Sequence, residues 1–339
     1  MSKQRDVTEE QLSEEFARCY HFVNPHLKEG FKSADGLSSG LSPEWNALLF
    51  GPNDGGRDSF RNLTEHLSSR AAAGSCRLQT EGQAFSWGNS HGCRVEEPHP
   101  GVYVFKGLFS KDWCAALLEE IDHMQSADVR QMEIVDLITR MRPNSMNNYG
   151  VHLNIVGMRK CMDDIMHNVL QPLAMAIFMS DHRDVYKQPA GLFPDQYVPL
   201  RSHHSFTIRY SLGEDTDLST HRDDSDVTLN VCLGKQFTGG SLFFCNTGVP
   251  QVDFNNPMQM PPTFDFDHEI GTAVVHLGRL QHGARPIASG TRCNLIMWGR
   301  TRPQVPTVRR ICGESECECE CEGGGGQEHA HHDAAADCK

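Results

Sequence analysis

The second half of the chain constrains the fold most, because from Ser205 onward it breaks into short β-rich runs separated by turn residues. The turn signals include Gly239-Gly240 and Ser289-Gly290-Thr291. We expect strands at residues 206–210, 226–233, 241–244, 271–277 and 292–299. A helical segment followed by many short strands predicts an α+β fold built on an antiparallel barrel or sandwich.

Two helices are expected ahead of these strands. After a strand at 102–105, Ser110 is a suitable N-cap for a helix whose apolar stripe recurs at a spacing of four, at Trp113, Leu117 and Ile121. A second helix is expected over 161–179, also with an apolar residue at every fourth position. Pro172 should kink or divide this second helix, because proline lacks the backbone N–H that the helix needs.

Polar composition at both ends predicts three parts. Residues 1–95 are expected to be a partly ordered N-terminal extension, with a short helix after a capping box formed by Thr8 and Gln11. Residues 96–303 carry the apolar runs and are expected to form the main domain. Residues 304–339, rich in Cys, Glu, Gly and His, are expected to be a disordered tail, and metal binding by this tail stays open.

Charge and cysteine content favour some environments over others. The formal net charge is −13 and the pI is about 5.7, so the acidic surface disfavours nucleic acid as a partner. The 13 cysteines show no regular disulfide spacing, and the N-terminus lacks the apolar core of a signal peptide. No apolar run approaches the roughly 20 residues needed to cross a bilayer. We therefore expect reduced thiols, no membrane association and a cytoplasmic or nuclear location.

The motif His-x-Asp is the strongest chemical signal, although it occurs three times, at residues 182–184, 221–223 and 331–333. A mononuclear iron oxygenase needs two imidazoles and one carboxylate on one face of the metal, with the other face open. On a strand, residues i and i+2 point the same way, so His-x-Asp at a strand end delivers two ligands to one point. The third ligand must come from a facing strand.

Only the second motif has suitable partners. His282 lies 61 residues after His221, just beyond the strand expected at 271–277, and Arg292 follows ten residues later. An arginine suits an anionic co-substrate because its guanidinium can donate two parallel hydrogen bonds. The motif at 182 is not followed by a histidine at the matching distance, and the motif at 331 has no chain left to supply one. Both are interpreted as solvated surface.

The segments around these residues resemble the 2-oxoglutarate- and Fe(II)-dependent oxygenase superfamily, in its prolyl 4-hydroxylase and lysyl hydroxylase branch. Within that branch they are most similar to the 2-oxoglutarate- and iron-dependent oxygenase domain-containing protein 2 group. The resemblance covers roughly residues 98–302 and depends on segments 142–147, 209–210, 220–223, 227–234, 237–242, 276–278, 282–286 and 290–295.

This resemblance implies a double-stranded β-helix, or jelly roll, with flanking helices. It implies that His221, Asp223 and His282 are the catalytic metal ligands for Fe(II), and that Arg292 pairs with the distal carboxylate of 2-oxoglutarate. It also implies a dioxygenase reaction in which O2 and 2-oxoglutarate are consumed, succinate and CO2 are released, and a C–H bond is hydroxylated. Ascorbate is the expected reductant, and a protein or peptide is the expected substrate.

Three further residues are expected near the co-substrate. Tyr210 falls where members of the branch often place a residue that contacts 2-oxoglutarate, although a structural barrel aromatic would look the same. Thr228 and Asn230 share one face of their strand and could line the pocket, unless that face points outward. The long loop at 246–262 is our expected substrate lid.

Three other functions stay open. A nucleic-acid demethylase of the AlkB type shares the motif and the Arg292-Cys293-Asn294 segment, but its arginine follows the distal histidine at a longer distance. A scaffold that keeps the fold without catalysis would need a blocked pocket. A metal-binding protein would use the Cys/His tail, whose spacing does not match a structural zinc site.

Overall fold

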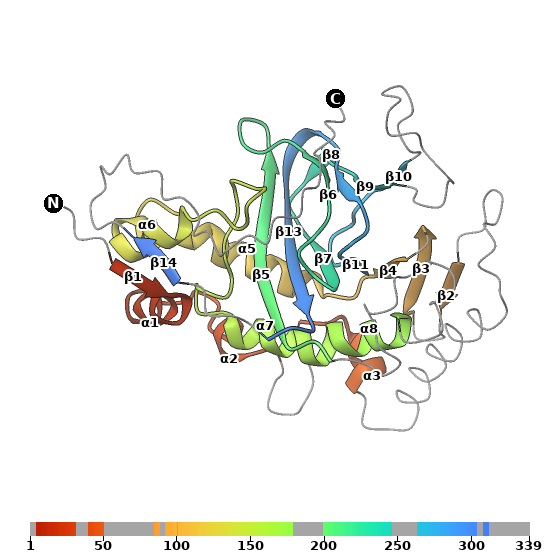
Figure 1. The fold of residues 1–339 in the computed structure, drawn as a ribbon, viewed down its shortest axis with the longest axis horizontal. Helices are drawn as coiled ribbons and strands as arrows, with labels where there is room; N and C mark the ends of the chain where they lie inside the picture. Colours follow the sequence, from red (N-terminus) through yellow and green to blue (C-terminus); the bar gives the residue numbers. More distant parts are fainter. Residues whose placement is uncertain are drawn as a thin grey trace.

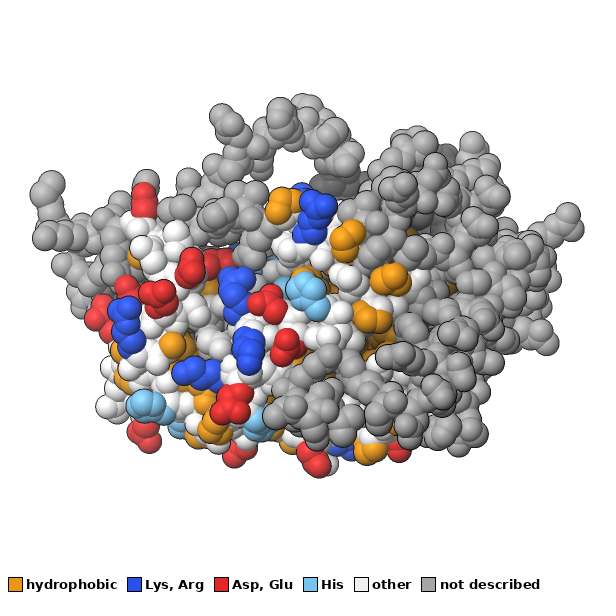
Figure 2. Space-filling view, turned by 90° about the horizontal axis from the view of Figure 1, so that it is seen from below, with side chains coloured by type: hydrophobic (Ala, Val, Ile, Leu, Met, Phe, Trp, Pro, Cys, Tyr) orange, Lys and Arg blue, Asp and Glu red, His pale blue; other side chains and the backbone are white. Residues whose placement is uncertain are grey.

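The structure is a computed structural model that describes residues 5–31, 40–50, 85–88, 92–99, 101–178, 199–245, 263–303 and 308–311. Its centre is formed by two antiparallel β-sheets, and the helices lie along the lower and left sides of the sheets in Figure 1. On the face seen in Figure 2, the described acidic and basic side chains are intermixed, with apolar side chains between them. None of the helices in the described ranges is long and apolar enough to span a bilayer.

The larger sheet has eight strands. Seven follow one path of neighbours, which runs through β2 (Phe85–Gly88), β3 (Arg94–His99), β4 (Val102–Lys106), β11 (Ala273–Leu277), β7 (Val227–Gly234), β13 (Ile287–Arg300) and β5 (Ser202–Ser211). The eighth strand, β8 (Phe237–Gly239), pairs with the first part of β13. The smaller sheet has four strands, in the order β10 (Thr263–Phe266), β9 (Leu242–Cys245), β12 (His282–Ala284) and β6 (Leu218–His221).

The strand order confirms the predicted α+β fold and its double-stranded β-helix. Going along the chain, β5, β7, β11 and β13 lie in the larger sheet, whereas β6, β9, β10 and β12 lie in the smaller one. The chain therefore passes repeatedly from one sheet to the other, which is the jelly-roll arrangement. All five strands expected from 206 to 299 are present, with β13 beginning five residues earlier than predicted, at Ile287. The short strands β6, β8, β10 and β12 were not predicted.

The helices that precede the barrel follow the expected pattern. Helix α5 (Lys111–Met124) begins after Ser110, whose side-chain oxygen accepts a hydrogen bond from the backbone N–H of Trp113 at 3.2 Å. The expected second helix is divided into α7 (Arg159–Ile165), a π-helical turn (Met166–Leu170) and α8 (Gln171–Phe178). The division falls just before Pro172, as predicted, because a residue without a backbone N–H cannot continue the regular hydrogen-bond ladder.

Residues ahead of the predicted domain boundary pack into the same core as the barrel. The capping box at Thr8 and Gln11 is present at the start of α1 (Glu9–Cys19), as predicted. The buried side chains include Phe16 of α1 and Trp45 of α3 (Pro43–Phe50). Strand β3 spans residue 95, and β1 (Arg5–Thr8) pairs with β14 (Val308–Ile311), whose residues had been assigned to the disordered tail. The division at residues 95 and 303 stays a prediction.

The loop from Arg142 to Val151 runs beside β5. Its backbone pairs with that strand at two points: Thr207 donates to the carbonyl of Val151 at 2.8 Å, and Arg209 donates to the carbonyl of Tyr149 at 3.0 Å. Gly150 has a φ of 156°, and a Cβ atom there would lie 1.9 Å from the carbonyl oxygen of Thr207. The close approach of the loop to the barrel therefore requires glycine.

We expect Gly150→Ala to lower the free energy of unfolding by about 2 kcal/mol, because the added methyl group must push the loop away from β5. Urea unfolding monitored by circular dichroism measures this change. Gly213→Ala is a matched control, since Gly213 also has a positive φ, of 89°, but a methyl group added there would meet no neighbouring atom within 4 Å. Equal losses of unfolding free energy in the two variants would mean that the close approach of residue 150 to the carbonyl of Thr207 does not affect stability.

Candidate metal and co-substrate site

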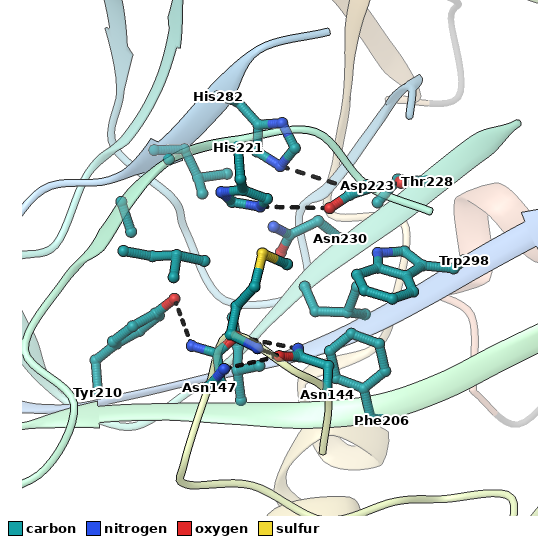
Figure 3. A pocket seen from close by; sticks show the side chains of 17 residues that line it. Asn144, Asn147, Phe206, Tyr210, His221, Asp223, Thr228, Asn230, His282 and Trp298 are labelled. Carbon is teal, nitrogen blue, oxygen red and sulfur yellow. Dashed lines mark hydrogen bonds and ion pairs between the residues drawn. The ribbon is translucent and has the colours of Figure 1, made fainter. Parts of the chain in front are cut away.

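Two histidines on paired strands face one carboxylate. His221, the last residue of β6, lies directly opposite His282, the first residue of β12. Asp223 follows β6 by two residues, and its backbone N–H donates to the carbonyl of Gly278 at 2.8 Å. One potential ligand atom from each of the three side chains lies within 4.8 Å of the others. Figure 3 shows both imidazoles turned toward Asp223, so these three side chains can hold one metal ion.

Hydrogen bonds orient both imidazoles for metal binding. The Nδ1 atoms of His221 and His282 lie 2.9 and 2.8 Å from the backbone carbonyls of Ser219 and Leu280. A carbonyl only accepts, so Nδ1 carries the proton and the lone pair is on Nε2. The two Nε2 atoms lie 3.4 and 3.6 Å from the carboxylate oxygens of Asp223. Partners of this kind on the distal ring nitrogen are typical of histidine ligands.

The electrostatic environment favours the protonation states that a metal needs. Burial alone would raise the pKa of the Asp223 carboxyl, but the neighbouring His282, His221 and His276 hold the pKa well below its usual value. Burial lowers the pKa of His282 to about 3, so its imidazole is neutral at pH 7. The Thr228 hydroxyl also donates to Asp223 at 2.6 Å. An anionic carboxylate and a neutral imidazole bind a divalent cation without first losing protons.

Arg292 is completely buried in the barrel, next to Tyr210. On β13 it lies opposite Tyr210 of β5, and its Cζ atom is 5.7 Å from the centre of that aromatic ring. Its Nε atom donates to Asn294 at 3.1 Å, and Nη1 donates to the carbonyl of Gly240. Within the described residues, Nη2 has no hydrogen-bond partner. A buried cationic donor without a partner is costly, so this atom is suited to an anionic ligand.

The other three predicted contacts line the pocket that contains His221, Asp223 and His282, but they act differently from one another. Tyr210 is buried, which raises its pKa to about 12 and keeps its hydroxyl protonated. Thr228 contacts Asp223 and so supports this candidate metal ligand. The side-chain oxygen of Asn230 accepts a hydrogen bond from Asn294 at 2.5 Å, which links it to the partner of Arg292. The pocket therefore contains all three side chains, whereas their contacts with a ligand stay predictions.

The structure adds residues that sequence reasoning had not assigned to the site. His276 on β11 is buried, with its Nε2 atom 3.9 Å from Asp223 and its ring centre 4.6 Å from that of His282. Its position within the apolar strand 273–277 was the available signal. The other additions form the pocket walls, and they include Asn144, Met146, Asn147, Phe206, Leu242 and Trp298. The indole N–H of Trp298 is buried without a partner among the described residues.

Several predicted features lie outside the described residues. These are the expected lid at 246–262, the rival motifs at 182–184 and 331–333, and the tail from 312 onward. The seven cysteines that the structure describes are all free.

Known proteins were compared with the chain. Residues 86–182 match the family model described as the OGFOD2-like domain. The chain is 38% identical over 208 residues to the 2-oxoglutarate and iron-dependent oxygenase domain-containing protein CP2 of Arabidopsis thaliana. It is 36% identical over 195 residues to the human 2-oxoglutarate and iron-dependent oxygenase domain-containing protein 2. This chain is a relative of these oxygenase domain-containing proteins. The resemblance predicted from the sequence is thereby confirmed.

The matches are partial in both directions. The alignments cover 61% and 57% of this chain, and the chain spans about half the length of these relatives, 47% of each. A more distant relative, at 27% identity over 60% of the chain, is the multifunctional procollagen lysine hydroxylase and glycosyltransferase LH3 of Rattus norvegicus, of which it covers 24%. A solved prolyl 4-hydroxylase from Pseudomonas putida shares 16% identity and a TM-score of 0.35, over 60% of this chain and 88% of that one. The fold assignment therefore rests on the strand order described above.

The hydroxyl of Thr228 supports a testable prediction for metal affinity. We expect Thr228→Val to weaken Mn(II) binding about tenfold, because Asp223 loses a hydrogen bond that orients its carboxylate. Thr228→Ser retains the hydroxyl and should bind Mn(II) nearly as the wild type does. Isothermal titration calorimetry measures both affinities. If Thr228→Val binds Mn(II) as tightly as Thr228→Ser does, the hydroxyl does not orient the Asp223 carboxylate.

Proposed function

We propose that this chain is an Fe(II)- and 2-oxoglutarate-dependent dioxygenase that hydroxylates an amino-acid side chain of a protein, of the prolyl or lysyl type. Succinate and CO2 would be the co-products. The observation that carries the proposal is the joint presence of the His221–Asp223–His282 group and the unpaired Nη2 atom of Arg292 in one barrel. The relatedness to oxygenase domain-containing proteins supports it.

The residues fit the two groups that this reaction needs. Two imidazoles and one carboxylate form the facial set of ligands that suits Fe(II) and leaves other positions open. The unpaired guanidinium N–H suits a carboxylate, and 2-oxoglutarate carries one at its far end. When bound, Fe(II) and 2-oxoglutarate together supply the means to activate O2 for attack on a C–H bond.

The side chains of the chain would perform the positioning. His221, Asp223 and His282 would hold Fe(II), with Thr228 orienting the carboxylate. Arg292 would bind the distal carboxylate of 2-oxoglutarate and so fix which end of the molecule faces the metal. The apolar walls formed by Phe206, Ile296 and Trp298 would exclude water from the reacting atoms.

The substrate class is inferred from relatives. One relative is named as a procollagen lysine hydroxylase, and this supports a protein or peptide substrate for the present chain. Ascorbate is the expected reductant, and a cytoplasmic or nuclear location is expected from the irregular spacing of the cysteines. The intermixed charges in Figure 2 offer no continuous basic surface on the part of that face that the structure describes, which supports the expectation that nucleic acid is not the substrate.

The test is succinate release from 2-oxoglutarate by the purified chain with Fe(II), ascorbate and O2. We expect slow turnover without a primary substrate, and its loss when a chelator removes the iron. Asp184→Ala, which alters the rival His-x-Asp motif, should leave turnover unchanged. If neither succinate release nor binding of 2-oxoglutarate is detected with metal present, the oxygenase proposal is wrong and a non-catalytic scaffold is the better description.

A further inference from the structure

A loop outside the barrel strands contributes three side chains to the pocket wall. Two neighbours hold its backbone: Arg142 donates to the carbonyls of Ser145 and Asn147 at 2.9 and 3.3 Å. The carboxylate of Asp215 accepts from the backbone and side chain of Asn148 at 2.7 and 2.8 Å. The loop is therefore fixed on both sides of Asn147, which is itself buried.

The direction of each hydrogen bond in this loop can be deduced. The side-chain oxygen of Asn144 accepts from the backbone N–H groups of Met146 and Asn147, both at 2.7 Å. A backbone N–H can only donate, so the amide of Asn144 cannot be turned round. Its Nδ2 atom must then donate to Oδ1 of Asn147 at 3.1 Å. With Oδ1 of Asn147 occupied in this way, its Nδ2 atom is left to face the hydroxyl of Tyr210 at 3.2 Å.

These hydrogen bonds determine whether the Tyr210 hydroxyl donates or accepts. Its oxygen accepts from Asn147, and the described residues contain no acceptor for its proton. Arg292 of β13 lies directly opposite Tyr210 of β5, and its Nη2 atom is also a donor without a partner among the described residues. Figure 3 shows the dashed contacts that run from Asn144 through Asn147 to the Tyr210 hydroxyl at one side of the pocket. Two buried donors without acceptors thus lie on neighbouring positions of β5 and β13.

We propose that Asn144 and Asn147 form a relay that holds Tyr210 as a hydrogen-bond donor to the distal carboxylate of 2-oxoglutarate, beside Arg292. The inference rests on the proposed function and assigns a positioning role to a loop that the metal site does not include. Met146, between the two asparagines, lines the pocket with His221 and Asp223. Movement of this loop by a bound substrate would therefore change co-substrate affinity as well.

The direction of the hydrogen bonds from Asn144 through Asn147 to Tyr210 can be reversed by a substitution that does not change the size of a side chain. In Asn144→Asp, the introduced carboxylate still accepts from the two backbone groups but no longer donates to Asn147. The Asn147 amide must then rotate and present Oδ1 to Tyr210, and this oxygen accepts the hydrogen bond that the tyrosine hydroxyl would otherwise donate to the ligand. We expect the Kd for 2-oxoglutarate to rise about tenfold or more, because one hydrogen bond to the carboxylate is lost.

A second variant, Asn147→Ala, distinguishes the effect of hydrogen-bond direction from a general loss of loop structure. Asn147→Ala removes the donor to Tyr210 but leaves the tyrosine proton free for the ligand, so its Kd should rise no more than about threefold. A structural role alone predicts the opposite order, because alanine removes more contacts than aspartate does. In a Tyr210→Phe background, Asn144→Asp should cause no further loss, since the acceptor of the relay is already absent.

Isothermal titration calorimetry of the full chain with 2-oxoglutarate and Mn(II) in place of Fe(II) measures these affinities without turnover. Ser145→Ala, on the exposed part of the same loop, is the control and should match the wild type. If Asn144→Asp binds 2-oxoglutarate as tightly as Asn147→Ala or the wild type, the relay is wrong. If the wild type itself binds no 2-oxoglutarate in the presence of Mn(II), it is the proposed function that fails.

Discussion

Asp223→Ala should abolish catalysis, with succinate formation reduced at least about 100-fold. Loss of an outer partner alone typically costs 10–100-fold in metal affinity or activity, and Asp223 is the only anionic member of its group. Without the carboxylate, His221 and His282 would have to hold the divalent ion with no compensating negative charge. We therefore expect Mn(II) binding, measured by calorimetry, to fall together with turnover, and added Fe(II) to restore little activity.

The neighbouring carboxylate provides a matched control. Asp224 pairs with Arg300 at 2.9 Å on the surface and contributes no atom to the metal group. An exposed ion pair adds only about 0–1 kcal/mol to stability, so Asp224→Ala should keep both metal binding and turnover. Retained activity in Asp223→Ala, or equal loss in the two variants, would contradict the assignment of Asp223 as a ligand.

The sequence predicted the metal group because strand geometry links spacing to position. His221 and Asp223 are two residues apart at a strand end, and His282 follows an expected strand after a separation long enough for the chain to return to the strand beside β6. Arg292 was found by the same argument, as a cation in a buried strand. These residues could be predicted since each belongs to a periodic element or its end.

The remaining parts of the site have no such periodic signal. Strands β6 and β12 have four and three residues, and they exist because β12 pairs with both β6 and β9 rather than because of their composition. The loop that holds Asn144 and Asn147 is polar and irregular, so only its resemblance to relatives drew attention to it. His276 lies in an apolar run, where one histidine does not reveal which group it faces. Long-range pairing decided each of these positions.

Arg292→Met should separate co-substrate binding from metal binding. The guanidinium would donate to the distal carboxylate of 2-oxoglutarate, and hydrogen bonds to charged groups contribute roughly 1.5–3 kcal/mol each. Loss of this charged contact should therefore raise the Kd for 2-oxoglutarate about 100-fold. The Mn(II) affinity should change by less than about threefold, because Arg292 donates no bond to the metal ligands.

Arg292→Lys tests whether charge alone is sufficient. Lysine retains the positive charge but offers a single ammonium group in place of the planar fork, so we expect an intermediate loss of about tenfold in 2-oxoglutarate affinity. Melting temperatures of both variants show whether the barrel remains folded, since Gly240 and Asn294 lose a donor in each case. If Arg292→Met binds 2-oxoglutarate like the wild type while metal binding is intact, the co-substrate lies elsewhere. The unpaired Nη2 atom would then need another anionic partner, because a buried guanidinium N–H is too costly to leave without one.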